Sequence, residues 1–450
     1  MMNKTTEKPI ARPKAATRTT RPGEAASTAP GARITSTMIG HASDVLTCLL
    51  EFSQPADAVL SNYFRENRSL GGRERAFIAE TCYTVLRRKR QLEKLVHPAK
   101  SPRWLVLAAL LRFAGVAQRQ LADVVSATEK DWLLEFKSRP DPEFSLAEQT
   151  DLPDWLAERL AARLATGELI DLARGLNQGA PLDVRVNALK ATREDVLARF
   201  NSEGIGAEAC RYAPFGIRLK SKPALQKHPL YLEGVIEVQD EGSQLLGALL
   251  APKRGEMVVD FCAGAGGKTL LLGAMMRSTG RLYAFDVSSK RLVKLKPRVA
   301  RSGLSNVHPI CIDNENDIRV KRLAGKIDRV LVDAPCSGLG TLRRNPDLKW
   351  RQTAQSVEEL ARKQRDILAG AARLVKPGGR LVYATCSILE EENGTVVDDF
   401  LAAHPQFRRL NAAEVLAQQD VVIDCGVDMR LLPHAHGTDG FYAAVLERSA

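Results

Sequence analysis

The chain has 450 residues, more than one hydrophobic core usually serves, so we expect two or three domains. With 44% hydrophobic and 26% charged residues, and no apolar run near the roughly 18 residues that span a bilayer, the composition excludes an integral membrane protein. Eight cysteines without a C-x-x-C pair argue against a zinc ribbon or disulfide scaffold; we expect no metal and a reducing, cytoplasmic location. The net charge of +12 fits a polyanionic partner such as nucleic acid, and a basic protein without such a partner is the alternative.

Residues 1–36 are predicted to be a disordered basic tail. They hold seven Lys and Arg residues and two acids among Pro, Thr, Ala and Gly, which leaves too little apolar surface to fold. An organelle transit peptide has a similar composition, but the four prolines would break the amphipathic helix that such a peptide needs. We therefore interpret the segment as a tail with loose affinity for RNA.

Residues 37–140 are predicted to be a small all-helical domain. Apolar residues recur at helical spacing in several stretches between His41 and Phe136. The run Arg87-Arg88-Lys89-Arg90 follows one of these apolar faces. It has two interpretations: a solvated helix end, where cations suit the helix dipole, or a contact with RNA.

Residues 150–235 combine short strands with helices. Pro153 begins a helix, and the sequence then predicts strands at 183–186 and 216–219 around a helix at 193–200. This pattern indicates a compact α+β module in front of the main domain.

Strands and helices alternate through residues 236–450, which predicts a doubly wound, Rossmann-like α/β domain. The expected strands are 257–261, 281–285, 307–312, 327–332 and 379–384, with a helix at 356–375 and closing strands at 429–432 and 441–446. Ligands bind beyond the carboxyl ends of the strands in such a sheet. Residues directly after a strand are therefore candidates for the site.

A glycine-rich turn follows the first of these strands. It reads Cys262-Ala263-Gly264-Ala265-Gly266-Gly267-Lys268-Thr269, and its glycines let the backbone approach a ligand held over the next helix. Asp286 closes the next strand 20 residues after Gly266, where it would accept hydrogen bonds from ribose hydroxyls, and Asp313 closes the third strand on the same edge. We therefore expect an adenosine-bearing cofactor.

Three kinds of cofactor compete for this turn. A phosphate-binding P-loop needs Gly five positions before Gly267, where Cys262 stands. A nicotinamide enzyme would explain the glycines but leaves Asp333, Cys336 and Cys386, which end two later strands, without a role. S-adenosylmethionine explains more of the chain.

The two strand-end cysteines have a simple alternative, since free cysteine is among the most buried residue types. Their position beside Asp333 favours a reaction centre. A thiolate that adds to carbon 6 of a cytosine makes carbon 5 nucleophilic enough to accept a methyl group, and an acid at ring nitrogen 3 stabilises the adduct. Asp333, Cys336 and Cys386 are the residue types that this chemistry needs.

The motifs Asp333-Ala334-Pro335-Cys336-Ser337-Gly338 and Thr385-Cys386-Ser387 resemble those of the Sun/Fmu family of RNA cytosine-5 methyltransferases. The resemblance covers about Pro181 to the C-terminus, including 433–441. It implies a class I S-adenosylmethionine-dependent methyltransferase fold, Cys386 as the nucleophile and Cys336 as the residue that assists release of methylated RNA. Lys268 and Asp333 would face the target base.

The implied cofactor contacts are Cys262, Ala263, Gly264, Ala265, Gly266, Gly267, Lys268, Asp286, Asp313 and Asp333. Gly264 and Ala265 replace the second Ala and the Pro of the family's usual loop, and losing Pro loosens a loop.

Residues 41–136 resemble, more weakly, the NusB-like helical domain of bacterial ribosomal RNA members, chiefly through 73–80. The α+β module would be the family's RNA-binding extension. We expect a monomer that methylates ribosomal RNA in a loop or an unassembled subunit, where the base can be flipped out. The sequence leaves tRNA open as the substrate, and a non-catalytic RNA-binding or assembly factor with this fold is the alternative function.

Residues 341–351 hold four cations and Trp350 next to the reaction centre. Cations and an aromatic ring suit phosphates and a stacked base, so we expect RNA contact here. The alternative is a solvated loop with Trp350 folded inward.

Overall fold

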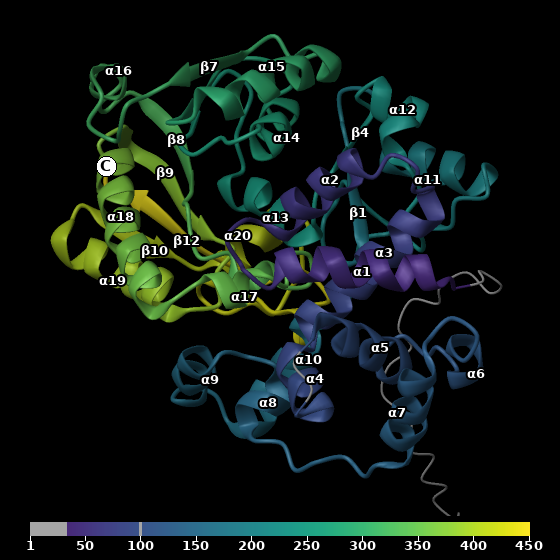
Figure 1. Cartoon of the computed structure of the whole chain (residues 1–450). Helices are drawn as coiled ribbons and strands as arrows, with labels where there is room; N and C mark the ends of the chain where they lie inside the picture. Colours follow the sequence, from purple (N-terminus) through teal and green to yellow (C-terminus); the bar gives the residue numbers. More distant parts are fainter. Residues whose placement is uncertain (1–33, 99–100) are drawn as a thin grey trace, which may run out of the picture.

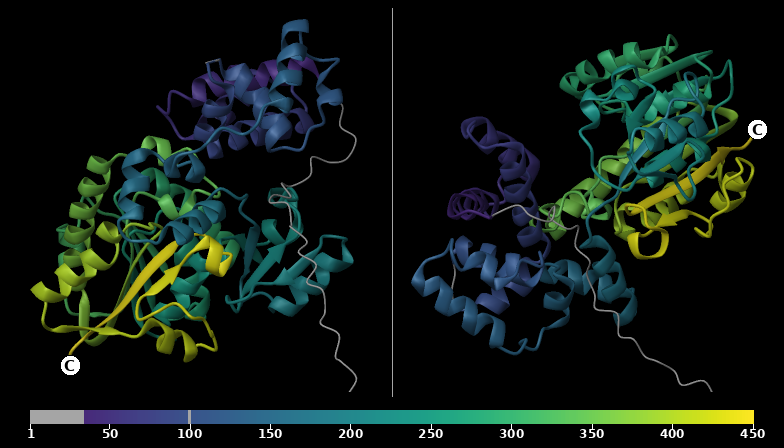
Figure 2. Two further views of the ribbon diagram at one scale, coloured as in Figure 1. Left: turned by 90° about the horizontal axis from the view of Figure 1, so that it is seen from below. Right: turned by 90° about the vertical axis from the view of Figure 1, so that its right-hand side faces the viewer.

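The computed structural model describes residues 34–98 and 101–450. The chain forms a helical N-terminal domain, a small α+β module and a large α/β domain (Figure 1). Figure 2 shows the helical domain set to one side of the α/β domain. Residues 1–33, most of the predicted tail, lie outside the described residues. Within the described ranges, no helix is both long and apolar enough to cross a membrane.

In the described part of the N-terminal domain, seven helices surround one hydrophobic core. They are α1 (Ser36–Leu49), α2 (Ala56–Glu66), α3 (Gly72–Arg87), α4 (Lys89–Val96), α5 (Pro102–Arg112), α6 (Gln118–Leu121) and α7 (Ala127–Ser138). Local signals set where helices begin: Pro102 lies in the first turn of α5, and Ser126 and Glu129 form a capping box at α7. The predicted helical character of this region is confirmed.

Three helices follow and reach the α/β domain: α8 (Leu146–Thr150), α9 (Asp154–Ala161) and α10 (Thr166–Leu176). Leu156 of α9 and Leu172 of α10 share a core with Leu339, which belongs to the α/β domain. The helix predicted to begin at Pro153 therefore exists as α9, but its apolar stripe is buried on the α/β domain rather than on the small module.

The α+β module is an antiparallel sheet ordered β2-β3-β1-β4. Its elements are β1 (Leu182–Val186), α11 (Arg193–Ser202), β2 (Ala207–Ala209), β3 (Gly216–Leu219), η1 (Leu225–Lys227), α12 (Pro229–Leu232) and β4 (Ile236–Val238). The two predicted strands and their helix are present. The sequence missed β2 and β4 because a three-residue strand is too short to show an alternating pattern. The sheet thus extends to residue 238, past the predicted boundary at 235.

The α/β domain contains a mixed sheet ordered β10-β12-β9-β8-β5-β6-β7, with β11 paired to β12. The parallel strands are β5 (Met257–Asp260), β6 (Arg281–Asp286), β7 (Val307–Cys311), β8 (Ile327–Asp333) and β9 (Val375–Thr385). Antiparallel partners are β10 (Phe407–Leu410), β11 (Met429–Leu431) and β12 (Phe441–Arg448). The predicted Rossmann-like sheet is confirmed, and β10 is an unpredicted addition.

Helices cover both faces of this sheet (Figure 1). They are α13 (Glu241–Leu250), α14 (Gly267–Met275), α15 (Ser289–Ser302), α16 (Ile318–Lys321), α17 (Leu348–Arg351), α18 (Ala354–Ala372), α19 (Gly394–Ala403), α20 (Ala412–Ala417) and α21 (Pro433–His436), with 3-10 turns η2 (Leu339–Thr341) and η3 (Glu390–Glu392). Side chains of α13 and α20 fill the core on one face, and those of α18 and α19 fill the core on the other. The neighbouring parallel strands β5, β8 and β9 end at one edge, where the predicted site residues lie.

Candidate active site

Two cysteines face each other at the ends of neighbouring parallel strands. Cys336 follows β8 and Cys386 follows β9, and the strand register pairs Asp333 with Ala384, which sets the two thiols side by side. Their Sγ atoms lie 3.4 Å apart, although 50 residues separate them in the chain. The interaction with Cys386 and burial raise the pKa of the Cys336 thiol well above its ordinary value. Cys336 therefore keeps its proton at neutral pH.

A partly buried ion pair borders the thiols. Lys268, in the first turn of α14, places Nζ 2.5 Å from Oδ2 of Asp333 at the end of β8. Burial, the largest single effect, lowers the pKa of Lys268. The charge and hydrogen bond of Asp333, with smaller contributions from Asp260 and Cys386, together outweigh burial and raise the pKa. The site thus holds a charged amine and a carboxylate within electrostatic reach of a thiol.

The glycine-rich turn joins β5 to α14. Cys262 and Ala263 begin it; burial raises the pKa of the Cys262 thiol, and the N–H of Ala263 donates to the carbonyl of Phe285 at 2.8 Å. Gly264 and Gly266 then adopt φ angles of +56° and +86°, in the left-handed region that favours glycine. This part of the turn requires glycine, as the sequence pattern indicated.

Asp286 supports the turn from the end of β6. Its carboxylate is 4% exposed, with Oδ2 accepting from the N–H of Gly264 at 2.8 Å and Oδ1 from the N–H of Ser288 at 2.7 Å. A Cβ atom placed on Gly264 would meet no atom within 4 Å, so that side of the turn is open. The structure thus provides open space beside a buried carboxylate.

Asp260 is a further acid next to the glycine-rich turn, and the sequence analysis did not identify it as a site residue. It ends β5, is 1% exposed and accepts a hydrogen bond from Oγ1 of Thr269 at 2.7 Å. The second oxygen of Asp260 is buried and has no hydrogen-bond partner among the described residues, and burial raises the pKa of Asp260 to about 7. The available signal was the acid at the end of the strand, the same signal that identified Asp286.

This set of groups fits S-adenosylmethionine. Asp260, Asp286 and Asp333 offer carboxylate oxygens around an open glycine turn. Such oxygens accept hydrogen bonds from ribose hydroxyls and from an ammonium group, and their charge complements a sulfonium cation. The partnerless oxygen of Asp260 is an acceptor still available inside the site.

Two arginines hold the turn from outside. Arg298 of α15 donates to the carbonyl of Ala265 at 2.6 Å, and Arg185 of β1 donates to the carbonyl of Gly267 at 2.7 Å. These bonds oppose the loosening that the missing Pro predicts. Sequence reasoning did not find them, because both arginines come from elements that only the folded chain brings to the turn.

Asp313 stands apart from the other predicted contacts. It follows β7, its side chain is 87% exposed, and its carboxylate lies 3.6 Å from Arg319. In the described ranges no hydrogen bond joins this carboxylate to the glycine-rich turn. Its role at the cofactor stays a prediction.

A buried glutamate links the two cysteine loops. Glu392, in η3, is 0% exposed and accepts hydrogen bonds from the N–H and Oγ of Ser337 at 2.8 and 2.5 Å. It also accepts from Oγ of Ser387 at 2.5 Å and from Nε2 of Gln364 at 3.0 Å. Each serine directly follows one of the cysteines. The sequence analysis missed Glu392 because the acidic run 390–392 suggests an exposed turn.

The predicted RNA contact at 341–351 is wrong for Arg343 and Arg344. Arg343 is 6% exposed and donates to the carbonyls of Gly437 and Thr438, both at 2.9 Å. Arg344 pairs with the buried carboxylates of Asp439 and Asp240 at 2.5 and 3.0 Å. Their charges are satisfied inside the protein, so they are not available to RNA phosphates.

The remainder of this segment binds the helical domain. Lys349 is 0% exposed and donates to the carbonyl of Arg87 and to Oδ1 of Asn177, both at 2.9 Å. Trp350 is folded inward, with Nε1 donating to the carbonyl of Leu86 at 2.9 Å. The segment is therefore an interface between domains.

The cationic run 87–90 is likewise paired within the protein rather than solvated. Arg88 lies 3.6 Å from Asp151, and Arg90 lies 2.6 Å from Asp154. Asp151 directly follows α8, and Asp154 is the first residue of α9. The run thus stabilises the fold between domains.

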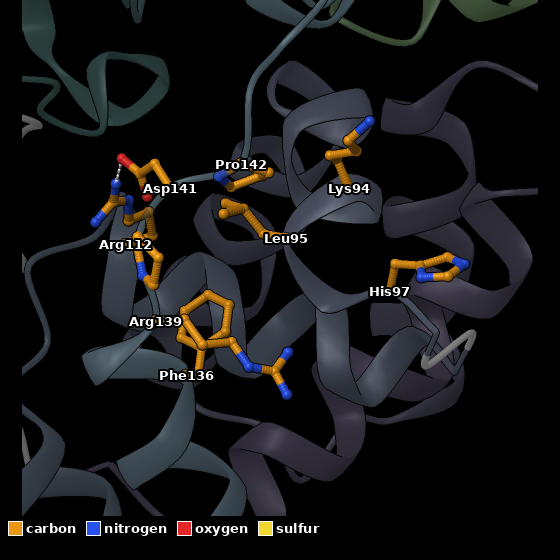
Figure 3. A pocket seen from close by; sticks show the side chains of 9 residues that line it. Lys94, Leu95, His97, Arg112, Phe136, Arg139, Asp141 and Pro142 are labelled. Carbon is orange, nitrogen blue, oxygen red and sulfur yellow. Dashed lines mark hydrogen bonds and ion pairs between the residues drawn. The ribbon is translucent and has the colours of Figure 1, made fainter.

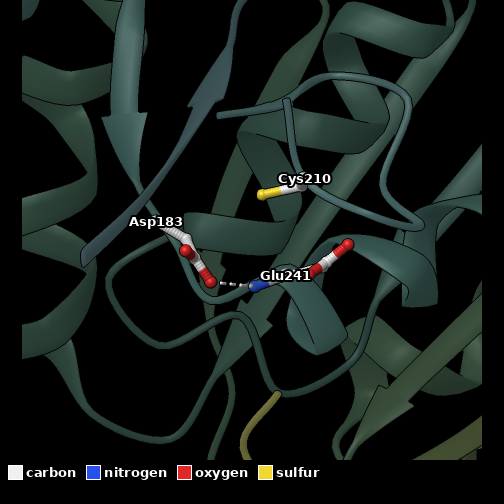
Figure 4. A group of neighbouring side chains, drawn as sticks. All are labelled: Asp183, Cys210 and Glu241. Carbon is white, nitrogen blue, oxygen red and sulfur yellow. Dashed lines mark hydrogen bonds between the residues drawn. The ribbon is translucent and has the colours of Figure 1, made fainter. Parts of the chain in front are cut away.

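A third group of charged side chains has the composition of a metal site (Figure 4). Asp183, Cys210 and Glu241 lie close together, but Arg218 donates to both oxygens of Asp183 at 2.8 and 3.0 Å and to Glu241 at 3.2 Å. Burial also raises the pKa of Cys210, which opposes the thiolate that metals bind. We interpret the cluster as an ion-pair junction between the α+β module and the α/β domain.

Comparisons with known proteins agree with this architecture. A family described as "16S rRNA methyltransferase RsmB/F" matches residues 247–447, and one described as "Methyltr_RsmF/B-like, ferredoxin-like domain" matches 152–226. The "Probable ribosomal RNA small subunit methyltransferase B" of Synechocystis is 37% identical over 307 residues, which cover 68% of each chain. The "Ribosomal RNA small subunit methyltransferase B" of Shewanella oneidensis is 31% identical over 402 residues, covering 83% of this chain and 91% of that protein.

The fold is shared over nearly the whole length with a solved structure. The crystal structure of PH0851 is 28% identical, has a TM-score of 0.75 and covers 92% of this chain and 99% of that one. The similarity thus includes the helical domain as well as the sheet that carries the thiols and the glycine-rich turn. The chain therefore belongs to the RsmB/F family of S-adenosylmethionine-dependent RNA methyltransferases.

Proposed function

We propose that the protein transfers a methyl group from S-adenosylmethionine to carbon 5 of a cytosine in the RNA of the small ribosomal subunit. The observation that carries the proposal is the pair of thiols 3.4 Å apart, beside the Lys268–Asp333 ion pair and the open glycine turn. The printed names of the relatives in Synechocystis and Shewanella oneidensis point to the substrate.

Cys386 is the nucleophile in this scheme. Its sulfur forms a bond to carbon 6 of the cytosine, which makes carbon 5 nucleophilic. Asp333 passes a proton of the Lys268–Asp333 pair to ring nitrogen 3, which neutralises the negative charge that develops there. S-adenosylmethionine supplies an electrophilic methyl group when bound. After transfer, loss of the carbon 5 proton re-forms the ring double bond as the carbon–sulfur bond breaks, and Cys336 assists this release.

The cofactor is held by the glycine-rich turn and the acids around it. The residues proposed for this role are Cys262, Ala263, Gly264, Ala265, Gly266, Gly267, Lys268, Asp286, Asp313 and Asp333. Asp286 supports the proposal most directly, because its buried carboxylate lies against the backbone of Gly264.

The helical domain and the α+β module are proposed to bind RNA. The helical domain is the part that resembles NusB, and the net charge of +12 favours a polyanionic partner. We further propose that the protein acts as a monomer in the cytoplasm, where it meets ribosomal RNA before the subunit is assembled.

Separate cysteine variants test the mechanism. Cys386→Ala removes the attacking sulfur, so it should abolish methyl transfer and form no covalent complex with RNA. Cys336→Ala should methylate once and then stall as protein joined to RNA, visible as a shifted band on a denaturing gel. The double variant should show no such band.

A third strand-end thiol supplies the control. Cys311 ends β7, away from the thiol pair, so Cys311→Ala should turn over like the wild type. A band with Cys386→Ala and none with Cys336→Ala would reverse the two roles. No band in either variant, while the wild type transfers radiolabelled methyl groups, would refute the covalent scheme. No transfer by the wild type to any RNA would instead support a non-catalytic RNA-binding factor.

A further inference from the structure

Helix α15 has an unusual charge for its position. It carries six Lys and Arg residues and no acid over its 14 residues. Arg298 and Arg301 turn toward β4 and pair with the buried carboxylate of Glu237, which ties the helix to the α+β module. These two arginines are compensated within the fold.

The three outer lysines of α15 have no such compensation. Lys290, Lys294 and Lys296 are exposed, and in the described ranges none of them forms an ion pair with an acid. Arg291, with 62% of its side chain exposed, lies 3.7 Å from Asp286. We name these four residues the α15 cationic face.

This arrangement opposes the stability of the helix itself. Lys290 and Arg291 lie in the first turn, where the helix dipole disfavours positive charge, and no acid of that turn offsets them. Lys290 and Lys294 are also one turn apart, so their charges repel. A helix with uncompensated charges of one sign is best explained by an anionic ligand bound there.

The cationic face borders the catalytic edge. α15 begins three residues after Asp286, and Arg298 of the same helix donates to the carbonyl of Ala265 in the cofactor turn. In Figure 1 the helix lies beside β7 and α14 on the outside of the sheet. Val287 and Val293 are 56% and 63% exposed near these cations and offer small apolar contacts.

Two other cationic regions of the protein are less suited to bind an anionic ligand. The segment 341–351 is used between domains, as described above. A pocket of about 340 Å³ in the helical domain is lined by Lys94, Arg112 and Arg139 (Figure 3), but each pairs with an acid, namely Glu148, Asp141 and Glu135. That pocket is balanced in charge, whereas the α15 cationic face is not.

We propose that the α15 cationic face binds the phosphodiester backbone of the substrate RNA next to the catalytic edge. The inference rests on the proposed function, since it adds a binding surface for the same RNA. Phosphates supply the missing counter-charges, and lysines are strong sequence-independent phosphate contacts. A membrane surface fits less well, because the large apolar side chains Leu292 and Leu295 are buried and only valines are exposed.

A salt titration of RNA binding tests the proposal. The surface variant is Lys290→Ala/Lys294→Ala/Lys296→Ala. The matched control is Lys253→Ala/Arg254→Ala/Lys326→Ala, which removes three exposed cations just before β5 and β8, at the opposite edge of the sheet. The probe is transcribed small-subunit ribosomal RNA, and its affinity is measured over a range of salt concentrations for the full chain.

The surface variant should lose about 0.7 to 0.9 in the slope of log affinity against log salt for each contact removed, so about 2 to 3 in total. Its affinity should fall roughly 10- to 100-fold near 0.15 M salt, with KM for RNA rising more than kcat falls. The control should keep the wild-type slope and affinity. A surface variant with the wild-type slope and affinity would overturn the proposal.

Binding and catalysis are measured separately, so the two proposals can fail separately. If the wild type binds RNA but transfers no methyl group, the proposed function fails. The salt dependence of RNA affinity still tests whether the α15 cationic face binds RNA. If the surface variant loses affinity for anionic phospholipid vesicles and not for RNA, the face serves a membrane and the proposal fails. The variant should unfold no earlier than the wild type, because repulsion is relieved. The single change Lys294→Glu, also expected to lower the slope, provides a second measurement.

Discussion

The Glu392 network allows the clearest prediction about how the site is held. Replacing Glu392 by Ala removes the acceptor of four hydrogen bonds and leaves buried donors of Ser337, Ser387 and Gln364 without partners. Each unsatisfied buried donor costs about 1–3 kcal/mol. Some donors will relax toward water, so we expect the free energy of unfolding to fall by about 3–5 kcal/mol, the range for breaking a buried polar network.

Glu392→Gln is the more informative change, because it keeps the volume of the side chain. The new amide group places a donor where the carboxylate oxygen accepted, so one side of the network is lost. We expect a smaller loss of unfolding free energy, about 1–3 kcal/mol. The loops that carry Cys336 and Cys386 should shift, and a misplacement near 1 Å can cost roughly 100-fold in rate.

The assay combines urea denaturation with single-turnover methyl transfer at saturating cofactor. Glu391→Gln is the matched control: Glu391 is the neighbouring residue, has 38% of its side chain exposed and pairs with Arg159 at 3.2 Å. A surface pair of this kind is worth at most about 1 kcal/mol. Cofactor affinity, measured by calorimetry, should stay unchanged in both variants. If Glu392→Gln matches Glu391→Gln in stability and in single-turnover rate, the network does not position the thiols.

Three further predictions follow from the geometry. Asp286→Ala should weaken S-adenosylmethionine binding by about 1–3 kcal/mol, since a buried acceptor is lost, and unchanged affinity by titration calorimetry would refute the assignment. Arg344→Ala should lower the free energy of unfolding by about 3–5 kcal/mol without changing the salt slope of RNA binding, because it leaves Asp240 and Asp439 unpaired; a lower slope with wild-type stability would restore the RNA assignment. Folding raises the pKa of Asp260 from 3.8 to about 7. The protonated side chain is therefore favoured in the folded state, and the free energy of unfolding should fall by about 4 kcal/mol as the pH rises from about 4 to 7. Asp260→Asn should flatten urea midpoints over that range, and an unchanged pH dependence would contradict this.

The edge that carries the candidate site was predictable because the succession of strands along the chain and their ends follow from local pattern. Apolar runs that end in Asp260, Asp286 or Asp333 are recognisable in isolation, and a parallel sheet gathers such ends at one edge. The same reasoning placed Cys336 and Cys386 together, and the structure sets them 3.4 Å apart. The apolar pattern of the sequence was enough to locate these residues, because each lies at the end of a β-strand or directly after one.

The charge of a residue in the sequence did not predict whether its side chain is exposed. Arg343 and Lys349 belong to a segment with the composition of an RNA-binding loop, but both are buried and bonded to distant parts of the chain. Glu392 is similar, because its donors come from other strands and from α18. Lys290, Lys294 and Lys296 of α15, in contrast, stay exposed on an amphipathic helix. Burial of a charge depends on tertiary contacts, and a sequence pattern does not contain them.

Residues 340–350 connect the helical domain to the two cysteine loops. Gly340, four residues after Cys336, donates its N–H to the carbonyl of Cys386 at 2.9 Å, and a Cβ atom there would lie 2.2 Å from the carbonyl oxygen of Gly440. Within ten further residues, Lys349 and Trp350 bind carbonyls at the end of α3 in the helical domain. One short segment therefore touches the loop of Cys386 at one end and the helical domain at the other. Because both ends are buried and hydrogen-bonded, the helical domain cannot be displaced without changing contacts that reach the loop of Cys336.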